Sequence, residues 1–343
     1  ETIDITIDDA ATTAIGAFNM HTEGMANTLS TGGTNKIAAG ALTLSGYLGS
    51  ATVTIATDAA TTNSSVKKVA ADINAVKDST GIEATAITKG KIAAVDTAGV
   101  ISFDLIGNQT NGAAATAYDV TATLASTADL DPLVDAINAH SANTGVTAIL
   151  GATAAEIILT HQTGENIELE AVSIGGGTGG TMVLHSLDKF GNAAGGADTT
   201  LNRTAGGIFT ISVGNAATGT ASASGFIMGQ MTLTSIKNFN VSGDATGTQT
   251  GYFNKKNGYT GQTSAGGTAK LSALSSISVA DQEHASDAIA VLDAAIAKID
   301  QQRADLGAIS NRLSSVVDNN TSMVTNTESS KSHILDTDFA VET

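Results

Sequence analysis

The side chains able to do acid–base or metal chemistry are scattered along this chain. Cysteine is absent, which removes thiolate metal sites and thiol nucleophiles together. No histidine belongs to a His-Glu-x-x-His pair, the pattern that puts two zinc ligands on one helix face. The six histidines are His21, His140, His161, His185, His284 and His333. We therefore expect no catalytic residue and no metal site, and for His284, at an expected helix start, a solvated turn.

One glycine-rich motif has the form of a phosphate-binding loop. Residues 175–180 read GGGTGG and follow the strand-like sequence IELEAVSI. The dinucleotide-binding fingerprint requires a helix directly after the glycines, because the helix amides and dipole hold the pyrophosphate. The next residues, TMVLHSL, favour another strand instead. The motif therefore predicts a loop, and we expect no cofactor.

Composition and charge limit the class of protein. The 343 residues contain 37 glycines and no tryptophan, which favours thin β-rich domains over one thick aromatic core. The formal net charge of −17 disfavours nucleic acid and anionic lipid, whose phosphates require clustered lysine and arginine. No run of about 18 apolar residues is present, so no membrane span is expected.

Strand patterns dominate the chain before its last helix. Residues 1–8 alternate apolar Ile3, Ile5 and Ile7 with polar residues, as in a strand that has one buried and one solvent-exposed face. Residues 42–57 predict one or two further strands, and residues 206–243 predict more. Residues 247–270 are rich in turn formers and too polar for a core of their own.

An internal repeat lies among these strands. Residues 71–86 align without a gap to residues 135–150, so that Ile73–Asn74 matches Ile137–Asn138. Each copy predicts a β–α–β–β unit, with amphipathic helices near 65–79 and 132–143. In the second copy Asp131 is the expected N-cap and Pro132 the first helical residue. Gly81 and Gly145 are the expected left-handed C-terminal caps.

The C-terminal stretch has a different periodicity. A stripe at alternating spacings of three and four, with a slip between Leu306 and Ile309, predicts a coiled-coil seam on a helix of about 45 residues and roughly 65–70 Å. Its members are Ile289, Leu292, Ile296, Ile299, Arg303, Leu306, Ile309, Leu313, Val316 and Asn320, with Arg303 and Asn320 as polar breaks. We call these ten residues the seam. It would expose more apolar surface than a monomer tolerates, so we expect helices of another chain or of a preceding segment to cover it.

Long motifs connect this helix to a known family. LDAAIAKIDQQRADLGAISNRL (292–313) and ILDTDFAVET (334–343) resemble the C-terminal helical core of bacterial flagellin. Residues 1–24 resemble the hairpin that closes the N-terminal core segment of that family. The repeated INA…TG unit is similar to a module of the variable flagellin insertion.

The resemblance implies an α+β multidomain fold. Residues 1–24 and 270–343 would form a flagellin-like core, with a hairpin piece and a long coiled-coil-type helix. Residues 25–114 and 115–200 would be β-rich outer modules with one repeat each, and 201–269 a turn-rich return to the core. Family members begin with helices that pair with the C-terminal one, so we expect such helices before Glu1 and an extreme C-terminal helix after Thr343.

The resemblance also implies a function: an extracellular structural subunit of the flagellar filament, without enzymatic activity. Its partners would be other flagellin subunits, with an export chaperone, a filament cap and a host innate immune receptor of the Toll-like family as further candidates. The alternative is a surface adhesin or glycan-binding protein whose β-rich repeats bind the ligand. Saccharide binding by the repeats, against filament formation by the helix, would discriminate the two.

Overall fold

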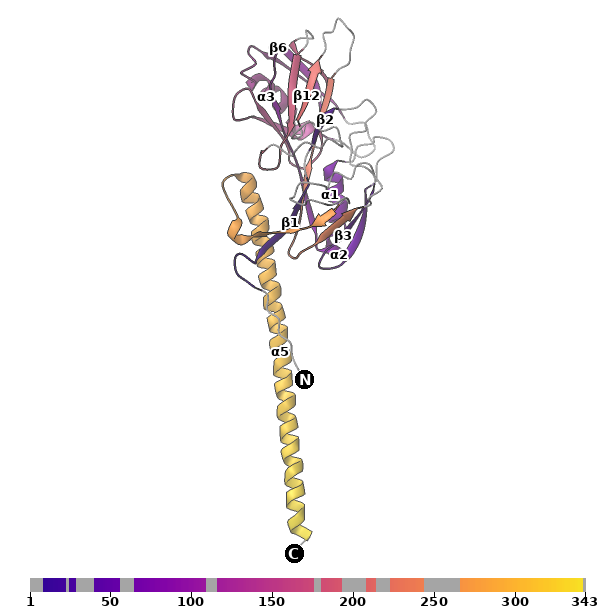
Figure 1. Cartoon of the computed structure of the whole chain (residues 1–343), viewed down its shortest axis with the longest axis vertical. Coiled ribbons are helices and arrows are strands. Elements are labelled where there is room, and N and C mark those ends of the chain that lie inside the picture. Colours follow the sequence, from indigo (N-terminus) through magenta and orange to yellow (C-terminus); the bar gives the residue numbers. More distant parts are fainter. Residues whose placement is uncertain are drawn as a thin grey trace.

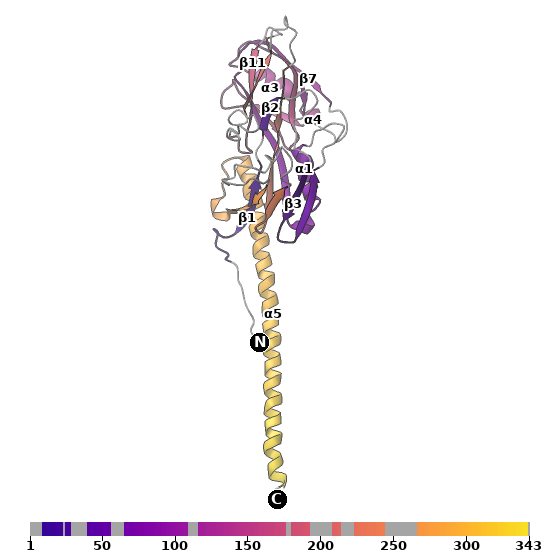
Figure 2. The ribbon, with the colours of Figure 1, turned by 45° about the vertical axis from the view of Figure 1, so that its right-hand side comes forward.

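A computed structural model describes residues 9–22, 25–28, 40–55, 65–108, 116–175, 180–192, 208–213, 223–243 and 266–341. Figures 1 and 2 show a β-rich body from which one long, nearly straight helix, α5 (Gln282–Val341), projects. We call the described residues before Gln282 the head and residues 300–341 the shaft. The α+β fold class is confirmed, but the expected length of the long helix was too short: α5 has 60 residues, about 90 Å at 1.5 Å per residue. The strand expected at residues 1–8 lies outside the described residues.

Antiparallel pairing joins the strands of the head into three sheets. The four-stranded sheet has the order β16 (Gly266–Thr268), β15 (Asn240–Gly243), β3 (Gly40–Ser45), β4 (Ser50–Ile55). The five-stranded sheet has the order β2 (Met25–Thr28), β13 (Ala223–Met228), β10 (Ile167–Ser173), β6 (Gly99–Ile106), β7 (Tyr118–Leu124). The hairpin β3–β4 confirms the strands expected in residues 42–57, since Thr43 pairs with Thr52 across it.

The third sheet connects the head to the long helix. Its order is β12 (Ile208–Val213), β11 (Gly180–Ser186), β5 (Glu83–Ala93), β14 (Gln230–Ser235), β1 (Gly16–His21), β17 (Lys270–Ala273). Off this path, β8 (Val146–Leu150) pairs with β9 (Ile157–His161), which pairs with β5. A short 3₁₀ helix, Leu274–Ser276, follows β17 and precedes α5. Strand β11 begins at Gly180, the last residue of the glycine motif, as expected, whereas a pyrophosphate-binding loop would continue into a helix.

Each of the two expected amphipathic helices is present but divided in two. The first comprises α1 (Val66–Asn74) and α2 (Lys77–Thr80), and the second comprises α3 (Asp131–Asn138) and α4 (Ser141–Thr144). The backbone leaves helical geometry between them, with Val76 at φ −109°, ψ 12°. Gly81 and Gly145 end α2 and α4 in the left-handed conformation, φ 73° and 72°, which confirms both expected caps.

The expected N-cap of the second helix is wrong by one position. Leu130 precedes α3, and Asp131 is its first helical residue. The Asp131 backbone N–H donates to Asp129 Oδ1 at 3.1 Å. The Asp129 side chain therefore closes a turn directly before the helix, as an Asx turn does. The Asp131 charge lies instead in the first helical turn, where the helix dipole favours it.

The head contains two hydrophobic cores joined by shared strands. Ile73 of α1 is fully buried in one core, and Ile137 of α3 is fully buried in the other. Strand β5 contributes Ala84 to the first core and Ile92 to the second. The two cores therefore cannot separate without breaking the pairing of β5.

Helix α5 begins on the head. Asp281 Oδ1 accepts the His284 backbone N–H at 2.7 Å, the bond of an N-cap, and this bond lowers the pKa of Asp281. One face of the first turns is then buried, through Ala288, Val291, Ala294 and Ala295. Val291 and Ala294 form a small core with Ala17 of β1. The helix is thus anchored at its N-terminal end.

Candidate functional site: the exposed face of the long helix

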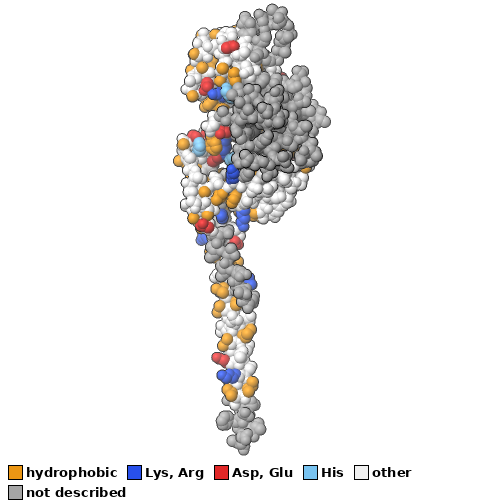
Figure 3. Space-filling model, viewed as in Figure 1, with side chains coloured by type: hydrophobic (Ala, Val, Ile, Leu, Met, Phe, Trp, Pro, Cys, Tyr) orange, Lys and Arg blue, Asp and Glu red, His pale blue; other side chains and the backbone are white. Residues whose placement is uncertain are grey.

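All ten seam residues lie on the single continuous helix α5, and none of them is buried. Near the head, Ile289 and Ile296 are 59% and 56% exposed, and on the shaft Leu313 is 46% exposed. Leu292, Ile299 and Leu306 are exposed as well, whereas Ile309 and Val316 are half-buried. Figure 3 shows hydrophobic side chains spaced along the length of the shaft. The described chain therefore leaves this stripe open to solvent.

The buried face of α5 is distinct from the seam. Ala288, Val291 and Ala295 each lie one position before a seam residue. At about 100° per residue, the two faces are separated by more than a quarter turn of the helix. Contact with β1 therefore uses small side chains, which permit close approach, and leaves the larger seam side chains free for another partner.

This small-residue face was not predicted from the sequence. Its alanines give a weak hydrophobic signal beside isoleucines and leucines one position away. The sign that could have found it is the sequence AVLDAAIA, which places small residues at helical spacing alongside the seam.

The two polar breaks in the seam are also exposed. Arg303 Nη1 lies 4.0 Å from Asp300 Oδ1, with both side chains largely in solvent. A pair of this kind contributes at most about 0.5 kcal/mol to helix stability. Asn320 is exposed as well. Neither polar residue is buried by the described part of the chain, so both remain accessible to a partner.

Polar side chains on the shaft form their hydrogen bonds within the helix itself. Several Ser and Thr hydroxyls donate to the carbonyl four residues earlier, at 2.7–3.1 Å. They are Ser315, Thr321, Ser322, Thr325, Thr327 and Ser330. Such bonds need no neighbouring element. The unmet requirement of the shaft is therefore apolar rather than polar.

Two ion pairs and one ring stack, which together we call the clasp, hold the first turns of α5 against the head. Lys89 Nζ lies 2.6 Å from Glu283 Oε1, and Lys189 Nζ lies 2.6 Å from Asp287 Oδ2. The Phe190 ring stacks on the His284 ring at a centroid distance of 4.4 Å. Both lysine side chains are nearly buried, so these pairs are less screened than ordinary surface pairs. His284, expected in a solvated turn, instead packs against the head.

Three other histidines of the head, His21, His161 and His185, lie on strands and are partly or fully buried. Burial, with a smaller contribution from the Lys189 charge, lowers the pKa of His21 to about 4, and Thr232 Oγ1 lies 3.0 Å from its Nδ1. Burial likewise lowers the pKa of His161 and of His185. Within the described ranges, no three His, Asp or Glu side chains lie close enough together to hold a metal ion. No helix in the described part of the chain has the length and hydropathy of a membrane span.

Comparison with known proteins agrees with the resemblance seen in the sequence. Residues 289–343 match the model of the bacterial flagellin C-terminal helical region. The B-type flagellin of Pseudomonas aeruginosa is 33% identical over 223 residues, which cover 65% of this chain and 40% of that protein. Flagellin A of Vibrio cholerae is 42% identical over 78 residues, 23% of this chain and 21% of its own length.

A third relative, polar flagellin C of Vibrio parahaemolyticus, is 53% identical over 57 residues, covering 17% of this chain and 15% of the relative. The chain thus spans well under half the length of each of these relatives. Together these matches confirm the resemblance to bacterial flagellin.

Proposed function

We propose that this chain forms part of the structural subunit of a bacterial flagellar filament, and that the seam of α5 is its assembly surface. The observation that carries the proposal is the exposure of the seam along a helix of 60 residues. An apolar stripe of this length on one helix is satisfied by other helices lying beside it. The β-rich head, which has its own cores, is the part that faces outward.

The assembly mechanism follows from how such contacts repeat. When one face of a subunit binds a different face of the next, the contact is heterologous. Heterologous contacts that do not close into a ring generate an open helical filament. Packing along α5 is therefore the activity of this protein, and its setting is outside the cell, in the flagellum.

The four-part division of the chain is proposed together with the function. In this division, residues 1–24 and 270–343 form the core, 25–114 and 115–200 form outer modules, and 201–269 return to the core. Support comes from β1, which pairs with β17 and packs against α5 although it lies far from both in the sequence.

We also propose that the two outer modules descend from one duplicated unit. In the first, the Asn74 side-chain amide donates to Ala84 O and accepts from Ala84 N, both at 2.8 Å. In the second, Asn138 makes the same two bonds to Ala148, again at 2.8 Å. The same amide clamp, which joins residues ten positions apart and encloses a left-handed glycine in both modules, supports a common origin.

The partners we propose are other copies of the same subunit. An export chaperone, a filament cap and an innate immune receptor remain candidates that depend on the family resemblance alone. The flagellin relatives favour the filament subunit over the adhesin alternative. They are also consistent with a structural protein rather than an enzyme.

The test places charge on the seam within the complete gene in its own host. Leu306→Asp combined with Leu313→Asp should abolish cell-surface filaments in electron micrographs, because each new carboxylate would be buried against a neighbouring helix. The matched control is Asn311→Asp, since Asn311 is exposed and lies on the side of α5 opposite both leucines. Filaments of normal number and length from the double variant would contradict the proposal.

A further inference from the structure

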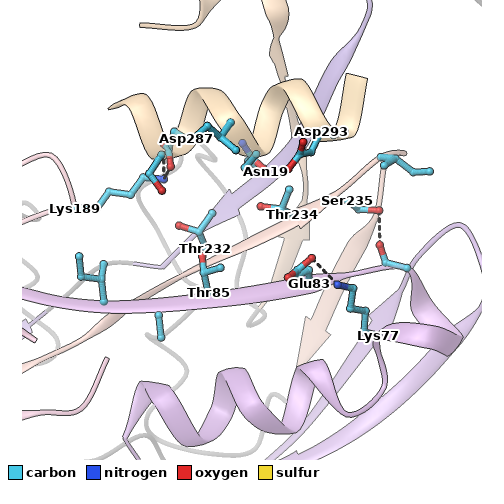
Figure 4. Close-up of a pocket in the computed structure, with 18 of the residues that line it drawn as sticks. Asn19, Lys77, Glu83, Thr85, Lys189, Thr232, Thr234, Ser235, Asp287 and Asp293 are labelled. Carbon is cyan, nitrogen blue, oxygen red and sulfur yellow. Dashed lines mark hydrogen bonds and ion pairs between the residues drawn. The ribbon is translucent and has the colours of Figure 1, made fainter. Parts of the chain in front are cut away.

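A cleft of about 770 Å³ lies between the first turns of α5 and the sheet beneath them. Figure 4 shows its floor, made by strands β1, β14 and β5, and its roof, made by α5. Asp287 and Asp293 come from the helix, while Asn19, Thr232, Thr234, Thr85 and Glu83 come from the strands. The lining includes Ile289 of the seam and Lys189, Glu283 and Asp287 of the clasp, whereas Asn19, Thr234 and Asp293 belong to neither.

The floor of the cleft is polar where a helix-covered sheet is ordinarily apolar. Alternation along the strands sends Met20, Leu233 and Ala84 into the core on one face. The other face carries cross-strand polar neighbours, because Thr234 pairs in register with both Asn19 and Glu83. Thr232 pairs with Thr85 in the adjoining row. A sheet face turned toward a helix normally gains stability from apolar contact, which here is limited to the small core of Ala17, Val291 and Ala294.

Several acceptors in the cleft have no donor. Asn19 Oδ1 is shut away from solvent and receives no hydrogen bond. The side chains of Thr234 and Asp293 line the same cleft and have no partner among the described residues. Of these acceptors Asn19 Oδ1 is the buried one, and a buried polar atom without a partner is unfavourable, so a donor that reaches it would be stabilised there.

The net negative charge of the cleft favours a donor that is positively charged. Five carboxylates line it against two lysines, and each lysine already has a carboxylate partner. Lys77 Nζ lies 2.7 Å from Glu83 Oε2, and Lys189 pairs with Asp287. Asp78 and Asp293 remain uncompensated. The cleft therefore repels anions and attracts cations.

We propose that this cleft is a binding site for a small organic cation with primary ammonium groups, such as a linear diamine. A primary ammonium has three N–H donors and no acceptor. It matches the Asp293 carboxylate, the Asn19 amide oxygen and the Thr234 hydroxyl. The second ammonium of a diamine reaches toward the other acidic positions of the lining. A neutral sugar would leave the Asp293 charge uncompensated, and the described residues offer no three-ligand group for a metal ion.

Titration of the chain with putrescine at low ionic strength, followed by calorimetry, tests this site. Saturable one-to-one binding is expected, and Asp293→Asn should weaken it at least about tenfold, because a charge-assisted bond becomes a neutral one. Asp293 is exposed on α5, so this variant should fold normally. The quaternised analogue of putrescine, with a trimethylammonium group at each end, carries the same charge without N–H donors and should bind more weakly than putrescine.

The control variant is Asp318→Asn, which removes the same charge from an exposed position on the shaft. It should leave putrescine binding unchanged. Equal weakening by both variants would show nonspecific attraction to a chain of net charge −17 and would overturn the site. The absence of saturable binding, or equal binding of glucose and putrescine, would overturn it too. The result does not depend on whether the chain forms filaments.

Discussion

In the head, Ile73 and Ile137 are completely buried, whereas on the shaft Leu306 and Leu313 are 40% and 46% exposed. Both regions are regular and hydrogen-bonded, yet only the head has side chains packed on every side. Isolated helices gain little stability from intrinsic propensity, and most helical stability in proteins comes from packing an apolar face. The head is therefore stabilised by contacts within the chain, whereas the shaft requires a partner to cover its apolar side chains.

The same contrast appears within two adjacent residues of α5. Val291 is 2% exposed and packs near Ala17, whereas Leu292 is 40% exposed. Two faces of one helix thus serve different purposes: small residues fix the helix to the head, and larger residues one position further on are left for assembly.

The largest expected effect concerns the cores of the head. Ile73→Ala and Ile137→Ala should each lower the free energy of unfolding of the head by about 2–5 kcal/mol, because each leaves a cavity. Leu313→Ala in the monomer should change it by less than about 0.5 kcal/mol, since the side chain is already in solvent. Chemical denaturation of the three variants measures the difference. A cost at Leu313 equal to that at Ile137 would remove the distinction between head and shaft.

Acid should weaken the head through His21. The pKa of His21 in the folded head, about 4, lies below the ordinary value of 6.5. Between these two pH values His21 is protonated in the unfolded chain and neutral in the folded head. Stability is then present above about pH 6.5 and is lost as the pH falls toward 4, by on the order of 3 kcal/mol. His21→Gln should flatten this part of the curve of unfolding free energy against pH. An unchanged slope would mean that His21 is not kept neutral by burial.

The smallest expected effect compares the two amide clamps. Asn74→Ala and Asn138→Ala each remove two hydrogen bonds and leave a strand N–H and C=O unpaired, so each should cost about 1–3 kcal/mol. The two costs should agree if the modules are equivalent. Asn311→Ala, at an exposed shaft position, is the control and should be nearly neutral. Thermal melts of the purified variants provide the comparison, and costs that differ severalfold would argue against equivalent modules.

Sequence patterns predicted the elements whose signal is local. The 3.6-residue period of α5, the alternation in β3 and β4, and the glycines after α2 and α4 each determine their own conformation. Prediction failed at the start of α3: Asp131 is the first helical residue rather than the N-cap, and its own backbone N–H donates to the Asp129 carboxylate.

Contacts between segments that are distant in the sequence could not be predicted from it either. The pairing of β1 with β14, the packing of Ala17 against Val291, and the pair Lys189–Asp287 all join residues more than ninety positions apart. No periodicity encodes such neighbours. The seam could be predicted because an unpacked apolar stripe is visible in the sequence itself, whereas the cleft beside Asn19 exists only once β1, β14 and β5 are assembled under α5.

Amide hydrogen exchange on the dilute, monomeric chain tests the central claim most directly. Because the seam lacks a partner within the described chain, the amides of residues 314–341 should exchange far faster than those of β5 and β6. Addition of a second helix-bearing subunit that covers Leu306 and Leu313 should slow them. If residues 319–330 in the monomer are protected as strongly as the sheets of the head, the shaft is stable without assembly and the account is contradicted.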